Sequence, residues 1–257
     1  MICNQVSLLI SRLGSALLLA TLVVSSAKSD DLLLAMSHEW PGGVHESQSG
    51  GSARSTYRHV EGTPDLAGAV PRIAAITYGS AEGTFVASGL DGSIFKIEGS
   101  RARLVYQHPG QIRDLALENG EGRIYFSVLA TPRGGDPLPD GEIWYFDLRT
   151  SRPNRFATIT QAMVGGDFWG TFSIQGGVLY AGTLTAHGQI YRIFPSGRSE
   201  LAAETNLGPI HGLAFATTGS LYVATGSQKI YRTRDFRTYD AVLHDPAGQF
   251  TDVTPRP

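Results

Sequence analysis

A pattern of three short apolar runs recurs along the chain and restricts its fold more than any other feature. In the clearest copy, residues 209–236 read PIHGLAFATTGSLYVATGSQKIYRTRDF, with turn residues between the runs. Short runs rich in β-branched and aromatic residues, bounded by Gly, Thr and Ser, are typical of antiparallel strands joined by tight turns. The first runs have anchor residues at steps of 39, 57, 41 and 40 positions: Ile73, Ile112, Trp169, Ile210 and Phe250.

A weaker fourth run follows each third run, so the repeating unit is four strands in about forty residues. One sheet of this size cannot bury both of its faces, and it must therefore stack on neighbouring copies around a ring. The sequence predicts an all-β chain that folds as a single β-propeller. A β-sandwich is the alternative, but it gives no reason for a fixed period.

The final copy has only a first strand, residues 250–254, before the chain ends at Pro257. We expect strands within residues 56–68 to complete this last blade as a composite of the two chain ends. Four full copies and one composite predict five four-stranded antiparallel blades, and six would follow if residues 30–55 also held strands. The Gly, Ser, His and Glu content of residues 30–55 favours a linker or irregular arm, with the propeller domain at 56–257.

The N-terminus has the pattern of an export signal. Arg12 precedes a mainly apolar run of twelve residues, 13–24, and small residues follow it. This run is too short to span a bilayer, so residues 1–29 are expected to be a cleaved signal peptide. A retained membrane anchor or a buried helix is the alternative. The only cysteine, Cys3, lies in this segment, so we expect a secreted or periplasmic mature chain without a disulfide.

Charge excludes two classes of partner. The 21 basic and 23 acidic residues give a net charge of −2 with no run of like charge, so no footprint for nucleic acid or anionic lipid is present. We expect a monomer whose partner is a small polar ligand or a protein, with no nucleic acid and no membrane contact after signal removal.

The segments PIHGLAFATTGSLYVAT, GQIYRIFPSG and DGSIFKI resemble the senescence-marker/gluconolactonase-like and NHL-like six-bladed propellers over residues 72–236. In the lactonase-like members, an acidic residue, an asparagine and an aspartate from different inner strands hold a divalent metal over the central channel. Here His211 stands at the position of that asparagine, and no Asn-Asp-Gly triplet occurs. We therefore expect no resident cofactor, and calcium only under the alternative function of a divalent-metal-dependent hydrolase or lactonase, which would use Asp114, Asp252 and His211.

Alignment of the first strands places Arg113 and His211 at equivalent positions, with Asp114 and Asp252 each one residue after the corresponding position. First strands line the channel of a propeller, so these four side chains are candidates to converge on its axis as a ligand-binding site. Such a site favours an anionic or polyhydroxyl small ligand, and we expect Asp114 to be paired with an arginine. The alternative is that Arg113 and Asp114 cap neighbouring strands and His211 is a satisfied inner-strand residue.

The stretch Gly-Gly-Asp-Phe-Trp-Gly at 165–170 adds Asp167 and Trp169 to the candidate ligand-binding residues. Aromatic faces beside a carboxylate suit carbohydrates or small cyclic ligands. The alternative is that Phe168 and Trp169 belong to the core between two blades. No catalytic residue can be assigned, and the sequence favours an exported ligand- or protein-binding module.

Overall fold

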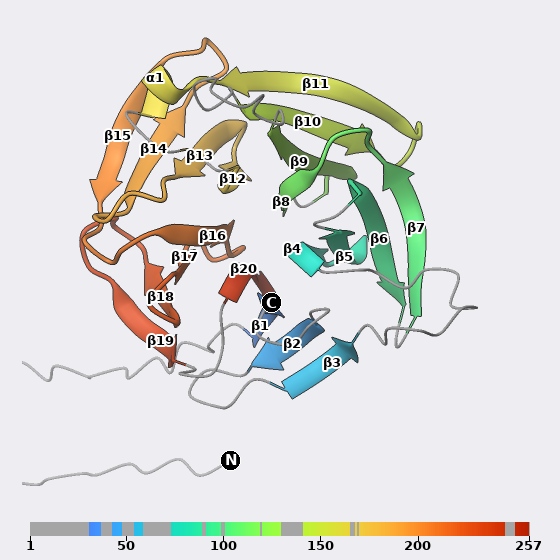
Figure 1. Ribbon diagram of the computed structural model, residues 1–257, viewed down its shortest axis with the longest axis horizontal. Helices are drawn as coiled ribbons and strands as arrows, with labels where there is room; N and C mark the ends of the chain where they lie inside the picture. Colours follow the sequence, from blue (N-terminus) through green and yellow to red (C-terminus); the bar gives the residue numbers. More distant parts are fainter. Residues whose placement is uncertain are drawn as a thin grey trace, which may run out of the picture.

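The computed structural model describes residues 31–36, 43–47, 54–58, 73–88, 91–98, 101–118, 120–129, 141–164, 168, 170–244 and 250–256. Within these ranges the chain forms twenty strands and one helix of four residues, α1 (Gln161–Val164). The strands lie in five four-stranded antiparallel sheets, which Figure 1 shows around a central axis. The prediction of an all-β propeller is confirmed.

Each sheet runs from an inner strand at the axis to an outer strand at the periphery (Figure 1). Four sheets come from consecutive strands. The first three of them are β4 (Ile73–Gly79), β5 (Gly83–Ser88), β6 (Ser93–Glu98) and β7 (Arg101–Gln107); β8 (Ile112–Leu117), β9 (Arg123–Leu129), β10 (Gly141–Asp147) and β11 (Arg152–Ile159); β12 (Phe172–Gln175), β13 (Val178–Gly182), β14 (Gln189–Ile193) and β15 (Ser199–Glu204). The fourth has β16 (Ile210–Phe215), β17 (Leu221–Thr225), β18 (Lys229–Thr233) and β19 (Asp240–His244). The fifth has β20 (Phe250–Arg256), β1 (Asp31–Met36), β2 (Gly43–Ser47) and β3 (Arg54–Arg58), in that order.

The fifth sheet joins the two ends of the described chain, but through a different segment from the one we predicted. β20 pairs with β1, with Leu34 opposite Val253 and Asp31 opposite Arg256. Residues 56–58 belong to β3, the outermost strand, and residues 59–68 lie outside the described ranges. The prediction that residues 56–68 pair beside the C-terminal strand is therefore wrong.

The assignment of residues 30–55 to a linker or irregular arm is also wrong, because β1, β2 and the start of β3 lie within them. The apolar run of β1, DLLLAM, suits a strand next to the axis, and Leu32 is buried against Phe250 and Val253. The sequence of β2, GVHES, has little apolar content, and that composition misled the prediction. The predicted signal peptide, residues 1–29, lies outside the described residues.

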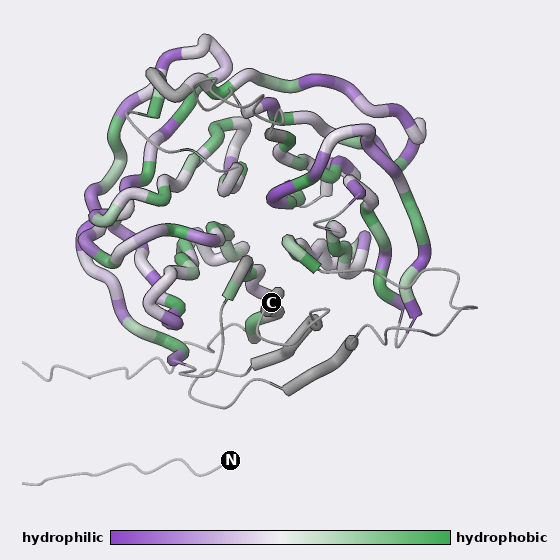
Figure 2. Tube along the Cα trace, viewed as in Figure 1, coloured by the Kyte–Doolittle hydropathy of each residue, from purple (hydrophilic) through white to green (hydrophobic). Residues whose placement is uncertain are grey.

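The hydrophobic core lies between neighbouring sheets. One buried cluster brings Phe85 and Ala87 of β5 against Ile112 of β8 and Phe126 of β9. Figure 2 shows that hydrophobic segments recur in every sheet from β4 to β19, separated by hydrophilic turns. This packing explains the repeat, because each sheet buries an apolar face against the next one and no sheet is stable alone.

Gly212 lies where two inner strands approach each other closely. A Cβ atom at this position would lie 2.7 Å from Cα of Asp252 and 3.0 Å from the backbone nitrogen of Val253, so β16 packs directly on β20. We expect Gly212→Ala to lower the free energy of unfolding by about 2–3 kcal/mol, because the clash is with backbone that cannot rotate away. Urea unfolding would measure the change. Gly120→Asn, at an open turn with φ +84°, is the control and should cost less than about 1 kcal/mol.

Candidate functional site

Four of the five inner strands carry a β-bulge at the same position, and these bulges define equivalent depths along the channel. On three inner strands the register shifts between Ile73 and Ala75, between Ile112 and Asp114, and between Ile210 and Gly212. On β20 it shifts between Phe250 and Asp252, which pair with Met36 and Ala35 of β1. The residues that fall between the paired positions are the ones that the sequence alignment made equivalent: Ala74, Arg113, His211 and Thr251. A bulge re-aims a side chain and is common beside functional sites.

Asp114 and Asp252 follow these bulges and are almost fully buried, with exposed fractions of 2% and 1%. The two carboxyl groups are hydrogen-bonded to each other, although their inner strands are separated by β4. They converge, as the alignment predicted.

Each carboxyl group also joins its own strand to the inner strand of the next sheet. Asp114 accepts the N–H of Leu115 on Oδ1 and the N–H of Phe172, on β12, on Oδ2, both at 2.7 Å. Asp252 accepts the N–H of Val253 on Oδ1 and the N–H of Ile76, on β4, on Oδ2, again at 2.7 Å. All four oxygens therefore bind backbone N–H groups, and the acid pair links sheets around the axis.

Burial raises the pKa of Asp114 to about 8, although its bonds to Phe172 and Leu115 act in the opposite direction. Burial also raises the pKa of Asp252 well above its ordinary value, and repulsion from Asp114 raises it further. Removing a carboxylate from water disfavours its charged form, and two close carboxylates cannot both ionise easily. The pair therefore retains a proton at neutral pH.

We expected Asp114 to be paired with an arginine, but its partners among the described residues are different. The carboxyl binds two backbone N–H groups and Asp252, while the exposed Arg113 donates from Nη2 to Oε1 of Gln111 at 3.2 Å. His211 is half-buried, and burial lowers the pKa of its imidazole. Its carbonyl oxygen accepts a hydrogen bond from Oγ1 of Thr171 at 3.2 Å, which is another link between neighbouring inner strands.

Asp167 and Trp169, the remaining candidates, lie outside the described residues. Their neighbour Phe168 is 1% exposed and packs in a cluster with Val164 and Phe172. This agrees with the alternative interpretation for Phe168, in which it belongs to the core between two blades.

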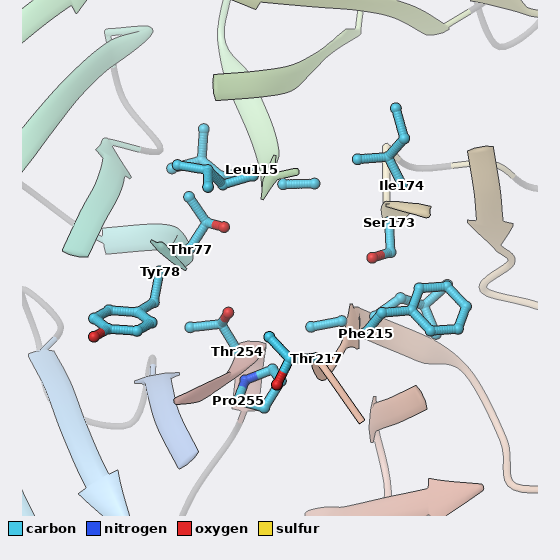
Figure 3. Close-up of a pocket in the computed structure, with 13 residues that line it drawn as sticks. Thr77, Tyr78, Leu115, Ser173, Ile174, Phe215, Thr217, Thr254 and Pro255 are labelled. Atoms are coloured by element: carbon cyan, nitrogen blue, oxygen red, sulfur yellow. The ribbon is translucent and has the colours of Figure 1, made fainter. Parts of the chain in front are cut away.

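A small pit opens on the axis further along the inner strands, two positions beyond the level of the acid pair (Figure 3). Its volume is about 30 Å³, which is room for one or two water molecules. Thr77, Ser173 and Thr254 point into it from three different inner strands. These three residues are 4%, 4% and 5% exposed, so most of each side chain is packed against protein.

No hydrogen bond joins these three hydroxyl groups to a residue that the structure describes, and their oxygen atoms, unlike Oγ of Ser127, are not sealed from solvent. Buried hydroxyls are nearly always bonded to protein or to ordered water, so these groups are available to a bound molecule. Sequence reasoning missed them, because Thr and Ser are ordinary strand residues. Their shared offset of four positions from the anchors Ile73, Trp169 and Phe250 is the signal that could have found them.

Two aromatic residues adjoin the pit, but their rings are directed away from it. Tyr78 lies on one side and Phe215 on the other, and both rings turn outward, where they pack against the clusters between neighbouring sheets (Figure 3). Phe215 is held in place by Tyr180, whose ring meets it edge-on at a centroid distance of 4.7 Å. The hydroxyl-bearing side chains therefore face the axis, and the aromatic rings belong to the core behind them.

Within the described ranges, no group of three or more His, Cys, Asp or Glu residues is arranged to hold a metal ion. The same part of the chain contains no helix that is long and apolar enough to cross a membrane.

No protein family matches the sequence, and no curated protein matches it either. Solved structures do resemble its fold. TolB from Acinetobacter baumannii superposes with a TM-score of 0.52 at 12% identity, over 90% of this chain and 67% of TolB. A putative gluconolactonase superposes with a TM-score of 0.51 at 11% identity, over 88% of this chain and 84% of the other. Similarity at this level of identity concerns the fold alone.

Proposed function

We propose that the protein is an exported, monomeric five-bladed propeller that binds a small polar ligand at the axial pit. The observation that carries the proposal is that three nearly buried residues, Thr77, Ser173 and Thr254, point their hydroxyl groups into the pit from three different inner strands. A hydrogen bond that replaces one to water contributes about 0.5–1.5 kcal/mol, so a molecule that bonds to these hydroxyl groups gains affinity and a fixed orientation. Export rests on the N-terminal sequence pattern, and five blades on the five sheets.

The second candidate is a divalent-metal-dependent hydrolase or lactonase, which the fold of the putative gluconolactonase and the two axial acids favour. The donor set fits a metal poorly. A hard cation needs several free oxygen ligands, whereas all four oxygens of Asp114 and Asp252 accept backbone N–H groups at 2.7 Å. Binding a cation there would require breaking bonds that join neighbouring sheets. The small-ligand module is therefore the preferred function.

Thermal unfolding with and without added compounds tests this choice, because a molecule that binds only the native state raises Tm by mass action. We expect 1 mM calcium chloride, with EDTA as the reference, to shift Tm by less than about 1 °C. Small amines, alcohols and carboxylic acids form the second arm. At least one of these classes should raise Tm by about 2 °C or more, and Thr254→Val should reduce that shift.

A large increase in Tm on adding calcium, if it persists in Thr254→Val and disappears in Asp114→Asn, would favour the hydrolase. No shift with any small molecule would contradict the proposed binding module.

A further inference from the structure

A second cavity lies between the second sheet (β8–β11) and the third sheet (β12–β15), which Figure 1 shows as neighbours in the ring. Its volume is about 320 Å³, against about 30 Å³ for the axial pit, and the two share no lining residue. The walls come from β11, α1, β13, β14 and the turn between β14 and β15, so no inner strand contributes to them. Small-molecule sites usually measure about 300–1,000 Å³, and this cavity is therefore large enough for a ligand.

The cavity has a buried apolar floor and an exposed rim. Leu179 and Ile193 line it and belong to the buried cluster between the two sheets, and the half-buried Met163 packs against that cluster. Phe156 and residues 195–197 also line it and are exposed. Solvent therefore reaches a space whose inner wall is part of the hydrophobic core.

The lining offers few polar groups to a ligand. None of the ten lining residues is charged. Two of them carry hydroxyl groups that already accept hydrogen bonds: Thr158 from Nη2 of Arg155 at 2.7 Å, and Ser196 from the N–H of Arg198 at 3.4 Å. Each arginine also forms an ion pair with a glutamate, at 3.2 Å and 3.6 Å. A charged ligand would therefore meet no unbalanced charge at these residues.

The bulges of the outer strands show why this space is open. The four sheets of consecutive strands each have one extra residue at the same place on the outer strand: Val105, Phe156, Ala202 and Val242. Val105, Ala202 and Val242 pack against the cluster between their own sheet and the next one. Phe156 instead is 36% exposed, and its ring meets Tyr125 of its own sheet edge-on at a centroid distance of 5.3 Å. The largest of the four side chains thus leaves the space beside the next sheet unfilled.

The turns between the third and fourth strands of the sheets have a similar effect. Leu148, after β10, and Phe236, after β18, pack against the cluster between their own sheet and the preceding one. In the third sheet, residues 194–197 of this turn line the cavity instead, and none of these four residues belongs to the cluster between the second and third sheets. These two sheets therefore enclose a cavity where the neighbouring pairs of sheets have apolar side chains.

The apolar walls determine which kind of molecule gains most by entering the cavity. Water inside it cannot bond to these walls, and a molecule that displaces the water gains free energy in proportion to the apolar area that it covers. An apolar cavity of about 150 Å³ binds benzene, so about 320 Å³ suits one or two rings. Met163 has a flexible side chain that adapts to the shape of such a ligand.

We propose that the cavity between the second and third sheets binds a small, uncharged, apolar molecule of one or two rings. The buried floor at Leu179 and Ile193 supplies the apolar contact, and the exposed rim at Phe156 is the route of entry. This second site goes beyond the proposed function, because it does not depend on the axial pit.

Indole and purine are matched probes, because both are flat double rings of the same size and purine has more polar nitrogen atoms. We expect ligand-observed NMR titrations of the purified protein at pH 7 to show indole binding at least about tenfold more tightly than purine. Ala157→Leu, which places a larger side chain in the cavity wall, should weaken indole binding by about tenfold or more. Phe156→Ala removes an exposed lining side chain, so this variant should fold normally and weaken indole binding by about threefold.

Two control variants separate this site from the rest of the surface and from the axial pit. Leu104→Ala removes another exposed apolar side chain from an outer strand, β7, and Thr254→Val changes the pit. Both should alter indole affinity by less than about twofold. Purine binding as tight as that of indole, or no indole binding at all, would overturn the apolar site.

Indole binding that Ala157→Leu and Phe156→Ala both leave unchanged would overturn it as well. So would loss of indole binding in Thr254→Val, because indole would then occupy the axial pit. Failure of the pit to bind polar ligands would leave these results as they are, so the two sites are tested separately.

Discussion

Removing residues 250–257 should lower the free energy of unfolding by more than about 5 kcal/mol or prevent folding altogether. β20 is the inner strand of the sheet that joins the two ends of the described chain. Phe250 and Val253, each 1% exposed, pack against Tyr222 and Ile230 of the preceding sheet. Burying two such side chains contributes about 1.5–3 kcal/mol each, and the deletion also removes the bond from Ile76 to Asp252 and the pairing with β1.

Far-UV circular dichroism with urea unfolding would measure the loss. Deletion of Pro257 alone, beyond the end of β20, is the control and should leave the unfolding midpoint within error. If the chain without residues 250–257 melted within about 2 °C of the complete one, ring closure through β20 would not stabilise the domain in the way that the packing implies.

The repeat made the propeller predictable because every sheet buries its apolar side chains against its neighbours in the same way. Each inner strand must bury apolar side chains against its neighbours, so anchors such as Ile73, Ile112 and Ile210 recur at similar spacing and are 1% exposed or less. The alignment of these anchors also identified Arg113 and His211 as equivalent. The bulges explain this, because each of the two residues is the extra, unpaired residue of the bulge on its inner strand.

The fifth sheet was harder to predict because its strands come from both ends of the chain and follow the repeat weakly. The run at Asp31–Met36 has the apolar content of a strand, but Gly43–Ser47 and Arg54–Arg58 have little. β2 and β3 stand further from the axis than β1 and β20. The composition of these two strands therefore resembles that of a linker.

The role of the axial acids could not be read from the sequence either. Convergence of Asp114 and Asp252 followed from the alignment, but the same convergence suits a ligand site and a structural pair. The difference lies in the backbone N–H groups of Phe172 and Ile76, which the fold brings to within 2.7 Å of the carboxylates. The sequence cannot identify these donors, because every residue except proline carries a backbone N–H group.

The acid pair predicts that the stability of the protein falls as pH rises from about 5 to 8. The pKa of Asp114 in the folded state is raised to about 8, and that of Asp252 is raised as well. The unfolded chain releases these protons near pH 4 while the folded state keeps them. Stability from this source is therefore complete below pH 4 and is lost as pH rises through the folded pKa, with a slope of about 1.4 kcal/mol per pH unit for each extra proton retained.

The double variant Asp114→Asn, Asp252→Asn removes the titration and keeps the size of both side chains. It should be less stable than the unmodified protein at pH 5 by about 2–4 kcal/mol, because each amide can accept only one of the two N–H groups that its carboxyl accepted. The difference should shrink steadily towards pH 8.5, since only the unmodified pair has to ionise there. Urea unfolding at several pH values measures both curves.

Asp235→Asn is the matched control, because it replaces a carboxylate whose pKa has moved in the opposite direction. Bonds from the backbone N–H groups of Thr238 and Arg237 lower the pKa of Asp235 to about 2, so this exposed group is ionised in both states from pH 5 to 8.5. Its stabilising effect is lost only as pH falls towards 2, and the control curve should therefore run parallel to that of the unmodified protein. A double variant whose curve also stayed parallel would mean that Asp114 and Asp252 ionise freely in the folded protein, and the proton-retaining pair on the axis would then have to be abandoned.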